Sequence, residues 1–95
     1  MNKYELMYVL KPATEEAERE ALLEKCKGII EEADGQVDNI EEWGLRKLSY
    51  EIQKENEGFY MLMHFQSDVD LPAELDRNLR IADPVIRHMI TRIEE

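Results

Sequence analysis

Arg46 and Lys47 are adjacent cations in a chain whose acidic residues outnumber its basic residues by 22 to 12. Guanidinium and ammonium groups placed together on an exposed segment can contact the phosphates of a nucleic acid. The pair follows Gly44, whose backbone freedom favours a bend or bulge in a strand. The alternative is an ordinary solvated pair, because most charged side chains simply lie on the protein surface.

A second group of cations lies near the C-terminal end of the chain. Residues 77–92 contain four arginines and a single acid, so this segment has a net charge of +3. Residues 14–42, in contrast, contain eleven acidic and three basic residues, a net charge of −8. This distribution predicts an acidic side, suited to a basic protein partner, and a neutral-to-basic side. The total charge of −10 opposes binding of the isolated chain to a nucleic acid.

Not every arginine in this group is a candidate for phosphate contact. Arg77 and Arg80 could pair with Glu74, Asp76 or Asp83 at the spacing of neighbours on one helix face. We favour this pairing for Arg77 and keep Arg80 as a candidate.

Residues that would support catalysis or metal binding are not arranged to do so. His64 and His88 have no partner at metal-ligand spacing, and no Ser or Cys is placed beside a base as a nucleophile would be. The four glycines form no phosphate-binding loop. We expect no enzyme activity, no metal and no cofactor. The lone Cys26 falls on an apolar helix face, where packing is the simplest interpretation.

Apolar periodicity predicts the element order β-α-β-β-α-β, which is the α+β ferredoxin-like fold. Both right-handed crossovers then place the two helices on one face of a four-stranded antiparallel sheet. The length suits one domain spanning 1–95. Strands are expected over 2–10, 36–43, 59–65 and 85–93, and helices over 14–33, capped by Thr14, and 70–81, capped by Asp70 or by Ser67 and Asp68.

Alternation within the strands predicts which side chains share a face of the sheet. In the first strand one face is fully apolar (Tyr4, Leu6, Tyr8 and Leu10), whereas the other begins charged and ends apolar (Lys3, Glu5, Met7 and Val9). Tyr60 and Leu62 make both faces of the third strand apolar, so we expect a partner to cover the face without helices. For the last strand, the pattern leaves open which face meets the helices.

The second strand alternates poorly, so we expect a bulge or a strong twist there. A long hairpin arm follows, in which Lys54, Asn56 and Gly58 are typical turn residues. The stretch Glu57-Gly58-Phe59-Tyr60-Met61 only partly fits the third-strand motif of RNA-recognition domains, which stack bases on exposed aromatics. The acidic end Glu94-Glu95 completes the chain.

The whole chain resembles the bacterial small-subunit ribosomal protein six family. Four pieces carry this resemblance: Tyr4-Glu5 with Val9-Leu10, Trp43-Gly44-Leu45-Arg46-Lys47-Leu48-Ser49-Tyr50-Glu51-Ile52, Gly58-Phe59-Tyr60, and Leu79-Arg80-Ile81-Ala82-Asp83-Pro84-Val85-Ile86-Arg87-His88. The resemblance implies a structural component of the small ribosomal subunit, with the βαββαβ fold and no enzyme activity.

The resemblance also implies two partners, the central domain of 16S rRNA and the small basic ribosomal protein eighteen, which binds as a heterodimer partner. We expect the partner protein on the face that holds Met7, Val9, Tyr60 and Leu62. We expect rRNA contact from seven basic residues: Arg46, Lys47, Arg80, Arg87, His88, Arg92 and, as a weaker candidate, Lys3.

Two alternatives remain. The charge total favours a ferredoxin-like interaction or regulatory module that never meets RNA, whereas the basic hairpin disfavours it. A small acyl-transfer or phosphatase enzyme on the same fold is remote, because its loop residues are absent. No apolar run reaches membrane-spanning length and the N-terminus has no signal-peptide pattern, so we expect a cytoplasmic location, on the ribosome if the resemblance holds.

Overall fold

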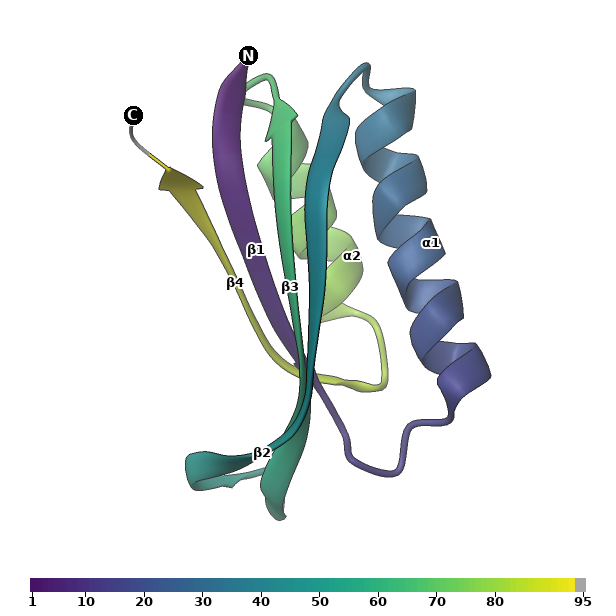
Figure 1. Cartoon of the computed structure of the whole chain (residues 1–95), viewed down its shortest axis with the longest axis vertical. Coiled ribbons are helices and arrows are strands. Elements are labelled where there is room, and N and C mark those ends of the chain that lie inside the picture. Colours follow the sequence, from purple (N-terminus) through teal and green to yellow (C-terminus); the bar gives the residue numbers. More distant parts are fainter. Residues whose placement is uncertain (94–95) are drawn as a thin grey trace.

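The computed structural model describes residues 1–93, which form one antiparallel sheet and two helices (Figure 1). The predicted order βαββαβ is confirmed, and the strands lie in the spatial order β2-β3-β1-β4. Glu94 and Glu95 lie outside the described residues. The elements are β1 (Asn2–Leu10), α1 (Glu16–Glu32), β2 (Gln36–Ile52), β3 (Glu55–Ser67), α2 (Leu71–Arg80) and β4 (Val85–Ile93).

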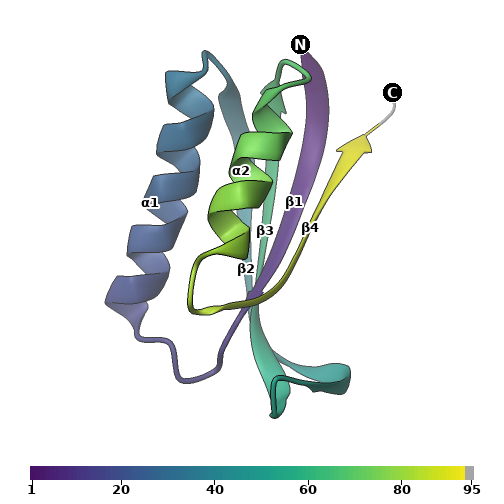
Figure 2. The same cartoon turned by 180° about the vertical axis from the view of Figure 1, so that it is seen from behind.

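Both helices lie on the same face of the sheet, as predicted (Figures 1 and 2). Figure 2 shows the molecule from the opposite side: α2 lies in front of the central strands, and α1 lies beside α2, on the β2 side of the sheet. We call the face without helices the open face. No helix among the described residues is both long and apolar enough to span a membrane.

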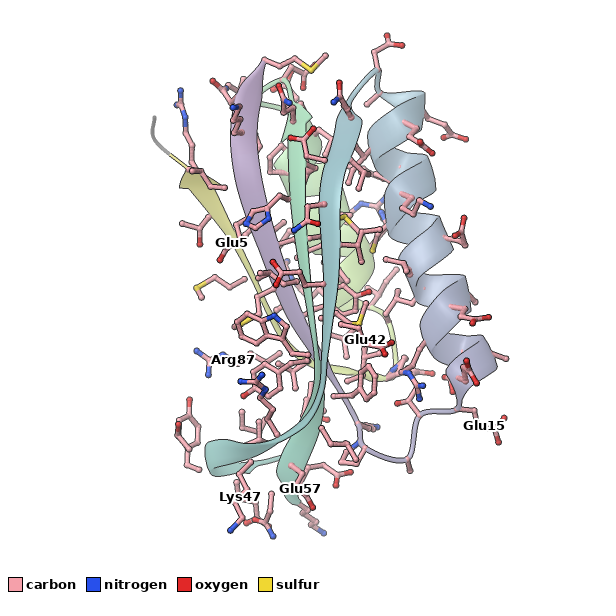
Figure 3. All side chains as sticks on the ribbon, in the orientation of Figure 1. Glu5, Glu15, Glu42, Lys47, Glu57 and Arg87 are labelled. Atoms are coloured by element: carbon pink, nitrogen blue, oxygen red, sulfur yellow. The ribbon has the colours of Figure 1, made fainter. Side chains whose placement is uncertain are left out.

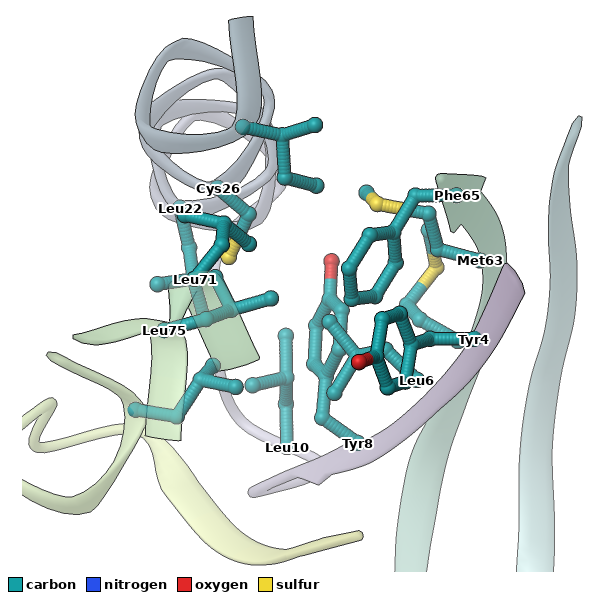
Figure 4. Close-up of a cluster of buried hydrophobic side chains, with 13 residues drawn as sticks. Tyr4, Leu6, Tyr8, Leu10, Leu22, Cys26, Met63, Phe65, Leu71 and Leu75 are labelled. Carbon is teal, nitrogen blue, oxygen red and sulfur yellow. The ribbon is translucent and has the colours of Figure 1, made fainter. Parts of the chain in front are cut away.

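The core forms between the helices and one side of the sheet (Figure 4). The alternation predicted for β1 is confirmed, since Tyr4, Leu6, Tyr8 and Leu10 are at most 7% exposed. Leucines of α2 and one side of α1 close the core from the other side. The helix residues buried there are Leu22, Cys26, Ile30, Leu71, Leu75 and Leu79. Burial raises the pKa of the Cys26 thiol to about 11, so this residue packs as a small apolar group.

The start of α1 differs from the prediction. Thr14 is not its N-cap, because the helix begins at Glu16 and Glu15 occupies the capping position without a side-chain cap. Thr14 instead belongs to the preceding turn, where its N–H donates to the Lys11 carbonyl at 3.0 Å. At the start of α2, Asp70 occupies the capping position without a side-chain cap. The Oδ1 of Asp68, the other predicted candidate, accepts from the N–H groups of Asp70 and Leu71.

The hairpin arm, residues 44–58, is built from strand rather than from a long loop. β2 continues to Ile52, and the turn lies at Gln53 and Lys54, both with positive φ (49° and 66°). The prediction that Asn56 and Gly58 form the turn is therefore wrong, because both lie in β3. The predicted irregularity of β2 is confirmed, since the β2–β3 register shifts at residues 37/39, 42/44 and 47/52.

Gly28 lies inside α1, where a β-carbon would meet no neighbouring atom within 4 Å. We expect Gly28→Ala to stabilise the protein by roughly 0.5–1 kcal/mol, because glycine loses more backbone entropy in a helix than alanine. Denaturant unfolding measures the change. Gly35→Ala is the matched control, because its β-carbon would lie 2.7 Å from the Gln66 carbonyl oxygen and should destabilise the fold. Lower stability of Gly28→Ala would contradict the expectation.

Candidate interaction surface

Strand register arranges the open face in rows that run across the sheet from β4 to β2. Two of these rows carry the residues of interest. One consists of Met89, Met7, Leu62 and Glu41; the next, closer to the arm, consists of Arg87, Val9, Tyr60 and Gly44. Every second residue along a strand points to the same face. The pairing of the strands therefore shows which side chains lie side by side on the open face.

The part of the open face far from the arm is polar. His64 and Glu5 lie in one row, and His64 Nε2 is 3.1 Å from Glu5 Oε2. The outermost row contains Lys3, which is exposed and opposite Gln66. This polar end leaves the apolar surface confined to the middle of the sheet.

The middle of the open face is apolar. Met89 is 48% exposed and Met7 is half-buried, while Leu62, next to Met7 in the same row, is 7% exposed. Met89 and Met7 are direct partners across β4 and β1, so their flexible side chains form one surface. Met7 and Leu62 belong to the face that the sequence analysis assigned to a protein partner.

Val9 lies beneath the arm instead of on the surface. It is 0% exposed, and its Cγ1 would be 2.2 Å from a β-carbon added to Gly58. Leu48 and Ile86 close the same cluster, at 3.5 and 3.6 Å from that position. Glycine at position 58 therefore lets the base of the arm pack onto Val9, which would back a partner surface without touching the partner.

The arm bends towards the β4 side of the molecule (Figures 1 and 3). Gly44 has φ of 79°, in the left-handed region that favours glycine, and stands next to the register shift at 42/44. Beyond the bend, Arg46 and Lys47 are exposed. The Arg46 guanidinium carbon is 4.9 Å from the centre of the Trp43 ring, and that ring stacks with Tyr60 at 6.5 Å and 16°.

The basic residues of β4 lie on both faces of the sheet. The sequence had left open which face of this strand meets the helices. Arg87 projects from the open face (Figure 3) in the row of Val9 and makes no ion pair among the described residues. His88 points to the helices, where its Nε2 lies 2.6 Å from Asp76 Oδ1. Arg92 is exposed and donates to Asn2 Oδ1 at 2.8 Å.

Asp76 on α2 also accepts from Arg80, so one carboxylate holds two of the candidate RNA-binding residues. The hydrogen bond from His88 is the main cause that lowers the pKa of Asp76, and Arg80 lowers it further. Arg77 pairs with Glu74 at 2.6 Å, which confirms the pairing favoured for it. For Arg80 the same kind of pairing is observed.

Charge is segregated across the sheet. β2 and β4 are its opposite edges, and α1 lies on the side of β2 (Figure 1). The acidic side therefore combines the outer surface of α1 with the first half of β2, whereas β4 contains Arg87, His88 and Arg92 and no acid. The predicted charge asymmetry is confirmed.

Sequence reasoning missed Trp43 and Met89 as surface residues. Trp43 is 40% exposed on the open face beside Tyr60, whereas the sequence placed it at the end of an irregular predicted strand with no clear alternation. The partial match to RNA-recognition domains fails at Phe59, which pairs with core-facing Leu10 and lies under the Arg19 guanidinium at 4.2 Å. The only sequence signal for Trp43 was its position one residue before Gly44.

Comparison with known proteins gives a consistent result. The model of the family "Ribosomal protein S6" matches residues 3–92. The small ribosomal subunit protein bS6 of Alkaliphilus metalliredigens (strain QYMF) is 64% identical over 95 residues, all of both chains. That of Clostridium botulinum (strain Okra / Type B1) is 56% identical, covering 95% of this chain and 96% of its own. The crystal structure of 30S ribosomal protein S6 from Thermotoga maritima has a TM-score of 0.90 and 40% identity, covering 97% of this chain and 87% of that one.

The bridge from Asp76 to His88 and Arg80 predicts a pH-dependent contribution to stability. Because the native pKa of Asp76 is lowered, its contribution is present above the ordinary carboxyl pKa and is lost as the pH falls through the native value. We expect Asp76→Asn to be less stable than the original chain near neutral pH, with the difference shrinking below about pH 4. Urea unfolding across pH measures it.

Glu74→Gln is the comparison variant, because Glu74 pairs only within α2, with Arg77, and this pair also lowers its pKa. Since that pair is exposed to solvent, we expect a smaller pH-dependent loss of stability than for Asp76→Asn. A stability difference for Asp76→Asn that persists unchanged at pH 2 would show that its carboxylate charge is not the cause.

Proposed function

The chain belongs to the ribosomal protein S6 family, and on this premise we propose that it binds the central domain of 16S rRNA as a heterodimer with ribosomal protein eighteen. It is a structural constituent of the small ribosomal subunit, located on the cytoplasmic ribosome, and not an enzyme. The observation that carries the proposal is the open face, where the apolar row of Met89, Met7 and Leu62 lies beside the row that begins at exposed Arg87. Exposed Arg46 lies at the same end of this face, against the Trp43 ring.

The partner protein docks on the middle of the open face in this proposal. Met7, Tyr60 and Met89 supply the accessible apolar contacts, backed by buried Leu62 and Val9. Such a surface on an otherwise charged molecule is typical of an interface. A small basic partner also fits a chain of net charge −10, because opposite charges steer the encounter.

RNA contact in this proposal centres on Arg46, Lys47 and Arg87. All three are exposed, and none of them pairs with a carboxylate among residues 1–93. Arg80 and His88 also belong to the proposed RNA surface, but contact with phosphate would compete with Asp76. Arg92 and Lys3 complete the proposed set at the end of the sheet far from the arm.

The proposed mechanism is positioning by phosphate contact. Few cations release few counterions, and the net charge of the chain repels RNA, so the chain alone should bind weakly. The partner adds positive charge and joins its own contacts to those of this chain. Binding to a central-domain fragment across a salt series, with and without the partner, tests the proposal: tight binding only by the pair supports it, and absence of binding by the pair overturns it.

Replacing Arg46 and Lys47 by Ala should weaken binding of the pair to the central-domain fragment. If each side chain neutralises one phosphate, the slope of log K against log salt should flatten by about 0.9 for each phosphate that is no longer neutralised. A salt series measured by filter binding gives both the affinity and the slope.

Lys25→Ala with Lys27→Ala is the control, because it removes the same charge from α1, far from the arm. Equal effects of the two double variants would mean that only total charge matters. An unchanged slope for the arm variant would place the RNA surface elsewhere.

A further inference from the structure

Three planar side chains follow one another on the open face at the base of the arm. The Arg46 guanidinium lies 4.9 Å from the Trp43 ring centre, and the Trp43 and Tyr60 rings are stacked at 6.5 Å with 16° between their planes. We call Arg46, Trp43 and Tyr60 the stacking ladder. We propose that an unpaired base of the bound RNA stacks against the Arg46 guanidinium and the exposed part of the Trp43 ring. The proposal rests on the proposed function and specifies part of its RNA contact.

The core does not account for the position of Trp43. Its side chain is 40% exposed and is absent from the buried cluster that joins helices and sheet. Part of the indole therefore stays accessible on the edge strand, where it is available for a contact beyond the chain. Its ring is nevertheless held in place, because Nε1 donates to Glu41 Oε1 at 3.4 Å and Tyr60 lies against it.

Local backbone geometry presents the ladder. The register shift at 42/44 and the positive φ of Gly44 set the last residue before the bend, Trp43, beside Tyr60. The arm then returns Arg46, whose backbone pairs with Gly58, to the same indole. The ladder therefore exists in the free protein, and a base joining it would need little rearrangement.

The chemistry of the ladder favours a nucleic-acid base over an apolar protein segment. Bases stack on aromatic rings and on guanidinium planes, and every base has such a π face. Arg46 provides a positive charge at the same point, and Arg87 lies two strands away from Tyr60 in the row that passes over Val9. Phosphates on either side of the stacked nucleotide would then find a cation. A paired base is already stacked on both sides, so the expected partner is unpaired.

Trp43 is the single tryptophan of the chain, which makes its fluorescence a direct probe. In the pair with ribosomal protein eighteen, adding the central-domain RNA fragment should quench this signal, taken as the difference between the original pair and the Trp43→Phe pair. Trp43→Leu should weaken RNA binding about 5- to 150-fold, the range for loss of one base–aromatic stack. The slope with salt should stay unchanged, because the indole carries no charge.

Two control variants separate stacking from folding. Trp43→Phe keeps a ring and should bind better than Trp43→Leu. Leu45→Ala removes another exposed apolar side chain of β2, which is 56% exposed and lies opposite Phe59 of β3, and should bind as the original does. Thermal unfolding of each variant reports whether the fold is intact.

The outcomes separate this inference from the proposed function. If the pair binds RNA but Trp43→Leu binds equally well and the fluorescence does not change, the stacking proposal is overturned while the proposed function stands. If the partner alone changes the fluorescence and RNA adds nothing, the ladder belongs to the protein interface and stacking is again overturned. If the original pair binds no RNA, both fail.

Discussion

The packing of α1 and α2 onto one face of the sheet is the constraint on which the rest of the molecule depends. A chain of 95 residues can cover one side of a four-stranded sheet, and the helix leucines with Tyr8 and Phe65 fill that side. The opposite side is left to side chains of the sheet itself. Its apolar middle is the direct consequence, and this is the surface on which the proposed partner protein would dock.

The arm modifies this open face before any partner arrives. Gly58 allows the arm to approach Val9, so part of the apolar surface is buried within the chain. Gly44 then turns β2, so that Arg46 lies against the Trp43 ring and Lys47 lies on the bent arm (Figure 3). Two glycines thus decide which residues of the open face stay available and where Arg46 and Lys47 point.

Charge pairing sorts the basic residues further. Asp76 binds Arg80 within α2 and His88 across the contact between α2 and β4, so both side chains help to hold the fold. Arg87, on the other face of the same strand, has no such partner in the described part of the chain. The basic residues of this stretch therefore differ: an RNA phosphate would have to displace Asp76 from Arg80 or His88, but no carboxylate from Arg87.

The sequence alone determined the order of elements, the face each β1 and β3 side chain takes and the place of the main bulge. These features follow from the alternation of apolar residues and from the backbone freedom of glycine, and both are local properties of the chain. Tertiary structure alone decided the face of Arg87, since both sides of β4 carry apolar and basic residues, and the burial of Val9, which depends on a contact distant in sequence. It also decided the position of the turn at Gln53 and Lys54, because neither residue with positive φ is a glycine that would mark the turn in the sequence. The neighbours of Trp43 depend on the structure too, because a bulge shifts the strand register there and simple alternation no longer gives the side-chain direction.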